Sequence, residues 1–231
     1  MDRKSRQLHS NYYILCEGTT EYNYFNSFKQ KIFTTSNVTI KIKNMHGGGY
    51  SNIMREIVKL GKTGFLAIFV IFDGDKAETL EEKKQLEKLI NFCKDRNEKL
   101  SAPCFLIINS PNFEYVACLH DPLYKGKNTS IYIEKILGYR DLENFKSDVK
   151  IYEKLNTEPR SYNVMVKRLK KQHNKIIQNK YKVETVKKIT ISSTKSDLNA
   201  IGKNGSNINE LFEILDIVLA NHVIVQLHQF G

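Results

Sequence analysis

The acidic residues best placed to do chemistry stand directly after apolar, strand-like segments of the sequence. Glu17 follows residues 10–16, and Asp73 and Asp75 follow the apolar run at 65–72. If both runs are parallel strands of one sheet, their carboxyl ends share the edge at which ligands bind. Carboxylates gathered there repel one another unless a cation neutralises them, and an all-oxygen site suits Mg²⁺, with Mn²⁺ as a substitute. The alternative is that Asp73 and Asp75 only cap the next helix or shape a turn.

Two further acids are predicted to reach the same edge. Glu21 lies one helical turn beyond Glu17, where it would serve as a further ligand or as a base. Glu114 follows the expected strand at 103–108, in the first turn of a helix that Pro111 would begin. The alternative for Glu114 is a first-turn acid favoured only by the helix dipole.

The three glycines at 47–49 separate a half-exposed strand at 38–42 from a helix that Ser51 would cap and that continues over 53–60. A glycine loop before a helix can bind phosphate through its backbone N–H groups. We favour the simpler interpretation, a glycine turn.

The pattern of apolar residues in the first half predicts the order β-α-β-α-β-α-β. This order is typical of a parallel sheet covered by helices on both faces. Strands are expected at 10–16, 38–42, 65–72 and 103–108, and the helix at 79–99 is expected to bury a stripe made of Leu80, Leu86, Leu89 and Ile90.

The second half of the chain reads differently and predicts mostly helices. They are expected at 112–120, 130–137, 142–155, 162–180 and 208–219, with one strand at 183–191 and a polar loop at 192–206. The predicted fold class is therefore α/β, a parallel sheet flanked by helices with an α-rich C-terminal elaboration. We place a catalytic core at residues 1–125 and a mostly helical, basic elaboration packed on that core at residues 126–231.

The positive charge of the chain is concentrated in one stretch. The 231 residues carry a formal net charge of +11, and between Arg160 and Lys195 eleven lysines and arginines stand against one acid, Glu184. Such a block is typical of proteins that bind the phosphate backbone of nucleic acid, whereas the alternative is a solvated helix face. The residues expected to contact nucleic acid are Arg160, Lys167, Arg168, Lys170, Lys171 and Lys175.

Several classes of protein are excluded by simple features. The longest apolar run, 65–72, has eight residues, too few to span a bilayer, and the N-terminal segment lacks a signal-peptide pattern. The four cysteines form no CxxC pair and are typical of reduced thiols. We therefore expect a cytoplasmic protein that is not bound to a membrane.

Three segments carry a resemblance to a known family: CEGTTE at 16–21, VIFDGD at 70–75 and NSPNFEYVACLH at 109–120. Together they resemble the RloB/AbiLii-type proteins of bacterial abortive-infection systems, which are similar to TOPRIM proteins. The resemblance covers residues 10–125 well and the remainder weakly. It implies a TOPRIM α/β fold, Mg²⁺-dependent phosphoryl chemistry on nucleic acid, and an antiphage role beside a partner ATPase.

The resemblance also assigns residues. Glu17 matches the TOPRIM glutamate, Asp73 and Asp75 match its DxD pair, and Glu114 matches the glutamate of the family's SNPxFExW-like segment, from which this chain departs by having Asn-Ser for Ser-Asn. The expected metal ligands are thus Glu17, Asp73, Asp75 and Glu114, with Glu21 added to the catalytic set.

The leading functional hypothesis is a metal-dependent nuclease that cleaves RNA, such as tRNA, or DNA. The alternative is a non-catalytic TOPRIM module that binds nucleic acid or an ATPase. Nucleotidyl transfer is a third option, which no nucleotide-binding motif supports. The sequence leaves a homo-oligomer open.

Overall fold

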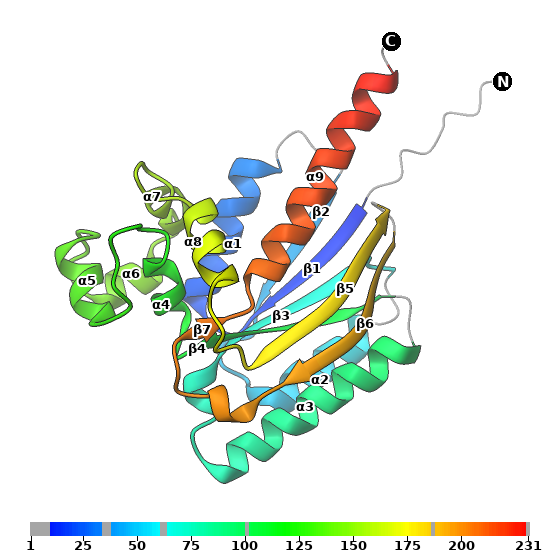
Figure 1. Cartoon of the computed structure of the whole chain (residues 1–231), viewed down its shortest axis with the longest axis horizontal. Coiled ribbons are helices and arrows are strands. Elements are labelled where there is room, and N and C mark those ends of the chain that lie inside the picture. Colours follow the sequence, from blue (N-terminus) through cyan, green and yellow to red (C-terminus); the bar gives the residue numbers. More distant parts are fainter. Residues whose placement is uncertain (1–9, 34–37, 61–63, 100–101, 186–187, 230–231) are drawn as a thin grey trace.

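The computed structural model describes residues 10–33, 38–60, 64–99, 102–185 and 188–229 (Figure 1). The elements follow one another along the chain as β1 (Ser10–Cys16), α1 (Thr19–Ile32), β2 (Val38–Asn44), α2 (Gly49–Leu60), β3 (Ala67–Asp73), η1 (Gly74–Lys76), α3 (Leu80–Lys99), β4 (Cys104–Ser110), α4 (Phe113–Cys118), α5 (Thr129–Lys135), α6 (Leu142–Ser147), α7 (Ile151–Leu155), α8 (Tyr162–Lys170), β5 (Ile177–Thr185), β6 (Lys188–Ser196), η2 (Leu198–Ala200), β7 (Gly205–Ser206) and α9 (Asn209–Gln229).

The main sheet has the strand order β2-β1-β3-β4-β7, and the α/β fold class is confirmed. The first four strands of this order are parallel, whereas β7 runs antiparallel to β4. From β1 the chain crosses to β2 on one side and later returns to β3 on the other side. The strand order therefore reverses between β1 and β3, which is the switch point where open α/β sheets bind ligands.

Alternate residues of the strands face two separate hydrophobic layers. On β3, Phe69 and Ile71 pack with α1 and α9, whereas Ile68 and Val70 pack with α2 and α3. Figure 1 shows α1 and α9 on one side of the sheet and α2 and α3 on the other. Because β3 is buried on both faces, its side chains are apolar until Asp73 at the edge.

Helix α3 begins with a capping box rather than with the acids that follow β3. The Thr79 hydroxyl accepts the Glu82 N–H at 3.2 Å, and the Glu82 carboxylate accepts the Thr79 N–H at 3.0 Å. The predicted buried stripe is confirmed at Leu86, Leu89 and Ile90. It is wrong at Leu80, which is 71% exposed, because the first turn of α3 lies beyond the ends of the strands (Figure 1).

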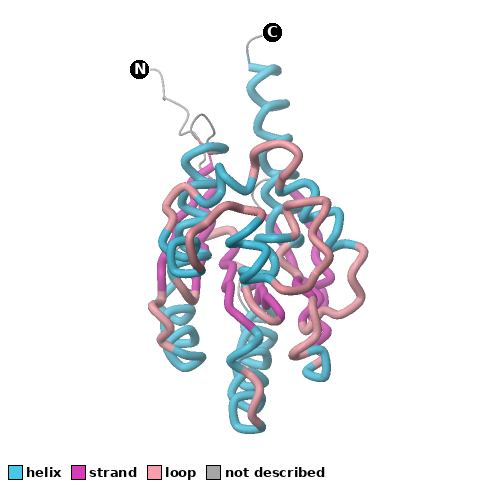
Figure 2. Tube along the Cα trace, turned by 90° about the vertical axis from the view of Figure 1, so that its left-hand side faces the viewer, coloured by secondary structure: helices cyan, strands magenta, loops and turns pink. Residues whose placement is uncertain are grey.

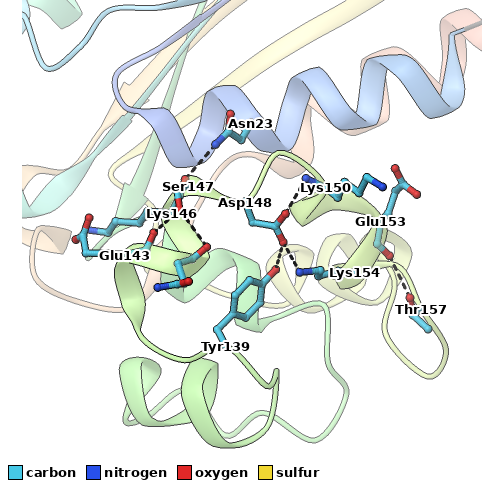
Figure 3. Close-up of polar contacts among 11 residues, drawn as sticks. Asn23, Tyr139, Glu143, Lys146, Ser147, Asp148, Lys150, Glu153, Lys154 and Thr157 are labelled. Carbon is cyan, nitrogen blue, oxygen red and sulfur yellow. Dashed lines mark hydrogen bonds and ion pairs between the residues drawn. The ribbon is translucent and has the colours of Figure 1, made fainter.

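The predicted helix at 142–155 is instead two short helices, α6 and α7. Asp148 breaks it by leaving the helical conformation, with ψ at 110°. Its carboxylate accepts the Lys150 N–H at 2.9 Å and the Tyr139 hydroxyl at 2.7 Å (Figure 3). These bonds favour a turn over a continuous helix.

The predicted basic helix at 162–180 is too long, and the single strand predicted at 183–191 is wrong because this region forms two strands. Helix α8 stops at Lys170, and β5 and β6 form an antiparallel hairpin. Apolar residues of β5 point to the core at Tyr181 and Val183, with exposed Lys182 between them. The many lysines of this stretch obscure the alternation of apolar and polar residues. The packing of β5 against α9 and β4 favours the strand. The C-terminal half of the chain thus contains a second sheet as well as helices.

The two halves of the chain share one core, since the layer around α1 contains Phe212 of α9 as well as Phe25 of α1, with ring centroids 5.9 Å apart. The boundary predicted at residue 125 remains a prediction. The C-terminal part of α9 projects beyond the rest of the molecule in both overall views (Figure 1, Figure 2). No helix within the described ranges is both long and apolar enough to cross a membrane.

The outer edge of β4 is hydrogen-bonded by side chains, except where it pairs with the short strand β7. The Asn207 amide accepts the Ile108 N–H at 2.9 Å and donates to the Leu106 carbonyl at 2.8 Å. At the other end of β4, Asn97 forms the same pair of bonds with the backbone of Cys104, at 2.7 and 3.1 Å. Each asparagine therefore replaces a peptide unit of a missing neighbouring strand.

Replacing Asn207 by alanine should lower the free energy of unfolding by about 2–3 kcal/mol, because a buried donor and a buried acceptor of β4 lose their partner. Urea denaturation followed by circular dichroism measures the change. The matched control is Asn91→Ala at an exposed position of α3, where we expect a change within about 0.5 kcal/mol. A loss no larger than that of the control would show that the Asn207 bonds do not stabilise the edge.

Candidate active site

The acids singled out in the sequence all line one pocket at the switch point of the sheet. Its volume is about 420 Å³, and it is formed by the end of β1, the first turn of α1, the segment after β3, and parts of α4 and α6. The structure therefore brings the predicted acidic set together, although the role of each residue remains a prediction. The lining residues are Glu17, Gly18, Thr19, Thr20, Glu21, Asp73, Asp75, Lys76, Asn112, Glu114, Glu143, Lys146 and Ser147.

Glu17 is the most firmly held carboxylate of this pocket, which we call the acidic pocket. One of its oxygens accepts the Asp73 N–H at 3.1 Å, and the other accepts the Lys76 ammonium at 2.6 Å. Its side chain is 7% exposed, whereas that of Lys76 is 55% exposed, so the lysine reaches in from solvent. Sequence reasoning missed Lys76, although it directly follows the DxD pair.

Asp73 ends β3 with its Oδ1 atom buried and without a hydrogen-bond partner. Burial raises the pKa of Asp73 well above its usual 3.8, and the charges of Glu21 and Glu114 raise it further. Asp73 makes no capping hydrogen bond to η1, and α3 has its own capping box. The capping alternative therefore does not account for Asp73.

Asp75 lies in η1, where its backbone N–H donates to the Pro111 carbonyl at 2.9 Å. This bond joins the segment after β3 to the segment after β4. Burial and the charge of Glu17 raise the pKa of Asp75, while Lys76 opposes the shift. Asp75 and Asp73 thus share the repulsion of Glu17.

Glu114 sits in the first turn of α4, as predicted, but Pro111 does not begin the helix. Asn112 is the cap, its side chain accepting the Tyr115 N–H at 3.2 Å, and Pro111 precedes it. Asn112 suits the N-cap position because its side chain accepts one of the free backbone N–H groups of the first turn, which a proline side chain cannot do. Burial raises the pKa of Glu114, and the nearby Lys146 lowers it in part.

Glu21 is buried in the acidic pocket, with only 3% of its surface exposed. Burial, followed by the charges of Glu114 and Glu17, raises its pKa from 4.5 to about 7, against a backbone hydrogen bond that lowers it. A carboxyl with a pKa near neutrality can both accept and release a proton under physiological conditions. Such values are enriched at catalytic positions.

Helix α6 also lines the acidic pocket, a contribution that the sequence did not reveal. The Lys146 ammonium lies 3.7 Å from the Glu114 carboxylate, and the Lys146 carbonyl accepts the Asn23 amide of α1 at 3.1 Å (Figure 3). The next turn is held by Asp148, which pairs with the Lys154 ammonium at 2.8 Å. These contacts fix the C-terminal end of α6 to both α1 and α7.

Across the described ranges of the chain, no three histidine, cysteine or acidic side chains are grouped closely enough to hold a metal by themselves. Two acids of the acidic pocket, Glu17 and Glu114, have a lysine within ion-pair distance. The acidic pocket is therefore rich in carboxylate oxygens but is not a closed cage of protein ligands.

The residues predicted to bind nucleic acid divide into two groups. Arg168 donates to the backbone carbonyls of Asp121 and Tyr124, so its guanidinium joins α8 to the segment after α4. Lys170 lies 3.4 Å from the Glu213 carboxylate of α9, and Lys175 donates to Asn209 at 3.1 Å. These three residues have partners within the fold.

Lys167 and Lys171 are exposed, and Lys167 also lines a shallow pocket of about 510 Å³ with Tyr124 and Val164. Arg160 is half-buried. The basic block does not form one continuous helix face, because its later lysines lie on the β5–β6 hairpin. Of the six residues predicted to contact nucleic acid, Lys167 and Lys171 are therefore the best candidates for contacting phosphate.

Comparison with known proteins gives one match. The family model described as RloB-like protein matches residues 12–215. The chain belongs to the RloB-like family. The matched region includes the whole acidic pocket, α8 and the β5–β6 hairpin, so these parts lie within the region that the family model covers. No curated protein and no solved structure matched the chain.

Replacing Glu21 by glutamine should stabilise the metal-free protein at pH 8. The pKa of its carboxyl is 4.5 in the unfolded chain and about 7 in the folded protein. The stability linked to this group is therefore fully present below pH 4.5 and is lost as the pH rises through 7. Glutamine keeps the shape without the charge, so we expect a gain of about 1–3 kcal/mol at pH 8 and almost none at pH 4.5.

Thermal denaturation in EDTA at the two pH values measures this effect. Glu87→Gln, at an exposed position of α3, is the control and should show no pH-dependent gain. If Glu21→Gln were destabilising at pH 8, Glu21 would be favourably ionised in the folded protein, and the raised pKa that burial and neighbouring charges give it would be wrong.

Proposed function

We propose that this protein is a Mg²⁺-dependent nuclease with a TOPRIM-type site, and that it cleaves RNA, such as tRNA, or DNA. The observation that carries the proposal is the charge of the acidic pocket. Six carboxylates line it, from Glu17 to Glu143, against two lysines, Lys76 and Lys146. Such an excess is costly in a folded protein unless a cation offsets it, which makes a functional role the better explanation.

The donor set fits a hydrated Mg²⁺ better than a fully protein-ligated ion. Mg²⁺ commonly keeps several waters and takes only one or two carboxylates plus substrate phosphate oxygens. The unpartnered Oδ1 of Asp73 is an available oxygen of this kind. Asp73 and Asp75 would hold the ion, with Glu114 and Glu17 as further ligands. When bound, the ion would supply Lewis-acid stabilisation of the negative charge on the phosphoryl group.

The remaining chemistry falls to the side chains themselves. Hydrolysis of a phosphodiester needs a group that takes a proton from the attacking water. Glu21 suits this role because its pKa of about 7 leaves it partly ionised at neutral pH. Glu17 is held by Lys76 and the Asp73 N–H, so it is the better group for orienting water or a ligand. Lys76 and Lys146 would offset the charge of the phosphate once it enters.

The biological setting rests on the family resemblance. Membership of the RloB-like family supports, as a proposal, a role in antiphage abortive infection beside a partner ATPase in the bacterial cytoplasm. A homo-oligomer remains compatible with this setting.

A non-catalytic binding module is the second candidate, and two observations favour it. Glu17 and Glu114 both have lysine neighbours, and the described residues hold no group of three potential ligands. In that case the acidic pocket would be a polar network that holds α1, α4 and α6 together. The first experiment below separates the two candidates.

Asp75→Asn should reduce cleavage of nucleic acid at least a hundredfold, because the variant loses a ligand charge without a change of shape. The assay incubates purified protein with labelled tRNA and labelled DNA in Mg²⁺, Mn²⁺ or EDTA. Asp95→Asn, at an exposed position of α3, is the matched control and should cleave like the unmodified protein. Cleavage that persists in EDTA, or in the Asp75→Asn variant, would contradict the proposed metal site. Binding without cleavage by the unmodified protein would favour the non-catalytic module.

The double variant Lys167→Gln/Lys171→Gln should weaken binding of single-stranded RNA of any sequence. Each lost phosphate contact lowers the slope of log affinity against log salt by about 0.7, so the pair should lower it by about 1.4. Fluorescence anisotropy in EDTA at several salt concentrations measures affinity without cleavage. The control, Lys84→Gln/Lys88→Gln on α3, removes the same charge from exposed positions. Equal slopes for both double variants would show that Lys167 and Lys171 are solvated and do not contact phosphate.

A further inference from the structure

A second pocket lies beside the acidic pocket and has the opposite charge. It has a volume of about 330 Å³ and is formed by the end of β2, the turn after it and one face of α2 from Asn52 to Lys59. We call it the basic pocket. Three cationic side chains line it against one carboxylate, so it is positively charged: Lys43, Arg55 and Lys59 against Glu56.

The single carboxylate of the basic pocket is shared between two lysines. Lys43 lies 2.8 Å from one oxygen of Glu56, and Lys59 lies 3.7 Å from the other. Arg55 instead donates to the amide oxygen of Asn52, and no carboxylate within the described ranges pairs with it. The guanidinium therefore keeps its full charge and most of its donors for a ligand.

Local backbone geometry places Asn52 at this pocket. Gly48 lies so close to Asn52 that an added Cβ would come within 2.5 Å of the amide nitrogen. The turn before it has left-handed residues at His46 (φ 51°) and Gly47 (φ 72°), as the predicted glycine turn requires. The Asn44 side chain accepts the His46 N–H at 2.8 Å and so fixes the start of that turn. Arg55 is thus oriented by its hydrogen bond to Asn52, which itself lies against Gly48.

The basic and acidic pockets are joined by direct hydrogen bonds. Asn44 of the basic pocket donates to the Thr19 hydroxyl of the acidic pocket at 3.2 Å, and the Gly47 N–H donates to the Glu17 carbonyl at 2.9 Å. The two pockets lie at the ends of neighbouring parallel strands, β2 and β1. A ligand that extends from one pocket would reach the other along this edge.

We infer that the basic pocket binds a phosphate group of a single nucleic-acid strand, next to the phosphate that enters the acidic pocket. A strand carries a negative charge at every linkage, and six carboxylates in the acidic pocket repel it. Arg55, with support from Lys43 and Lys59, offsets this repulsion on the neighbouring phosphate, for which guanidinium geometry is well suited. This inference rests on the proposed function, because it takes the nucleic-acid strand to be the substrate.

The test measures binding of a fluorescein-labelled 12-nucleotide single-stranded RNA by anisotropy in EDTA, where no metal-dependent cleavage takes place. Arg55→Gln should weaken binding roughly fivefold and lower the salt slope by about 0.7, with Lys59→Gln changing both in the same direction. Both residues are exposed, so the fold should be retained, which circular dichroism checks. Lys88→Gln, exposed on α3, is the control and should bind like the unmodified protein.

Failure of this inference is distinct from failure of the nuclease proposal. If Arg55→Gln and Lys59→Gln bind with unchanged affinity and salt slope, or if the unmodified protein does not bind the RNA, the basic pocket is not a phosphate site. If the protein cleaves nothing in any metal but Arg55→Gln still weakens binding with the lower slope, the phosphate site stands and only the catalytic proposal falls. Competition by inorganic phosphate that Arg55→Gln abolishes would support the site directly.

Discussion

Mutual repulsion among buried carboxylates is the constraint around which this protein is arranged. The acids come from four separate segments, after β1, after β3, in α4 and in α6, and the topology of the sheet forces these segments to meet. Their neighbours respond to that charge: Lys76 and the Asp73 N–H stabilise Glu17, and Lys146 approaches Glu114 from α6. Even so, burial and then the neighbouring negative charges raise the pKa values of Glu21 and Asp73, so the compensation is incomplete. A fold that keeps such a cluster gives up stability at neutral pH, as sites that bind cations or phosphates commonly do.

Much of the fold and the acidic set could be predicted because their signals are local. A strand buried on both faces, such as β3, reads as an apolar run, and the acid at its end marks the ligand-binding edge. The β5–β6 hairpin could not be predicted in the same way. Lysines and other polar residues separate its few apolar residues, so the alternation is weak in the sequence. Contacts with α9, such as the hydrogen bond from the Tyr181 hydroxyl to Glu213 at 3.0 Å, decide its conformation.

The parts of the site that the sequence missed depend on tertiary contacts. Lys146 reaches the acidic pocket only because Asp148 ends α6 and Asn23 holds the Lys146 carbonyl. Arg55 lies on a helix with no distinctive motif, and its role emerges only from the pocket that β2 and α2 form together. Lysines and arginines are common on protein surfaces, so spacing alone does not separate a functional cation from a solvated one.

The two asparagines along β4 also affect how copies of this protein can associate. An open strand edge invites pairing with another chain, which is the usual route to ordered aggregates. Asn97 and Asn207 occupy hydrogen-bonding positions along the β4 edge, and the β5–β6 hairpin packs beside it. At the opposite edge, β2 carries Lys41 and Lys43, residues that resist edge-to-edge pairing by charge. A dimer of this protein would therefore have to form through side-chain surfaces rather than by extending its sheet.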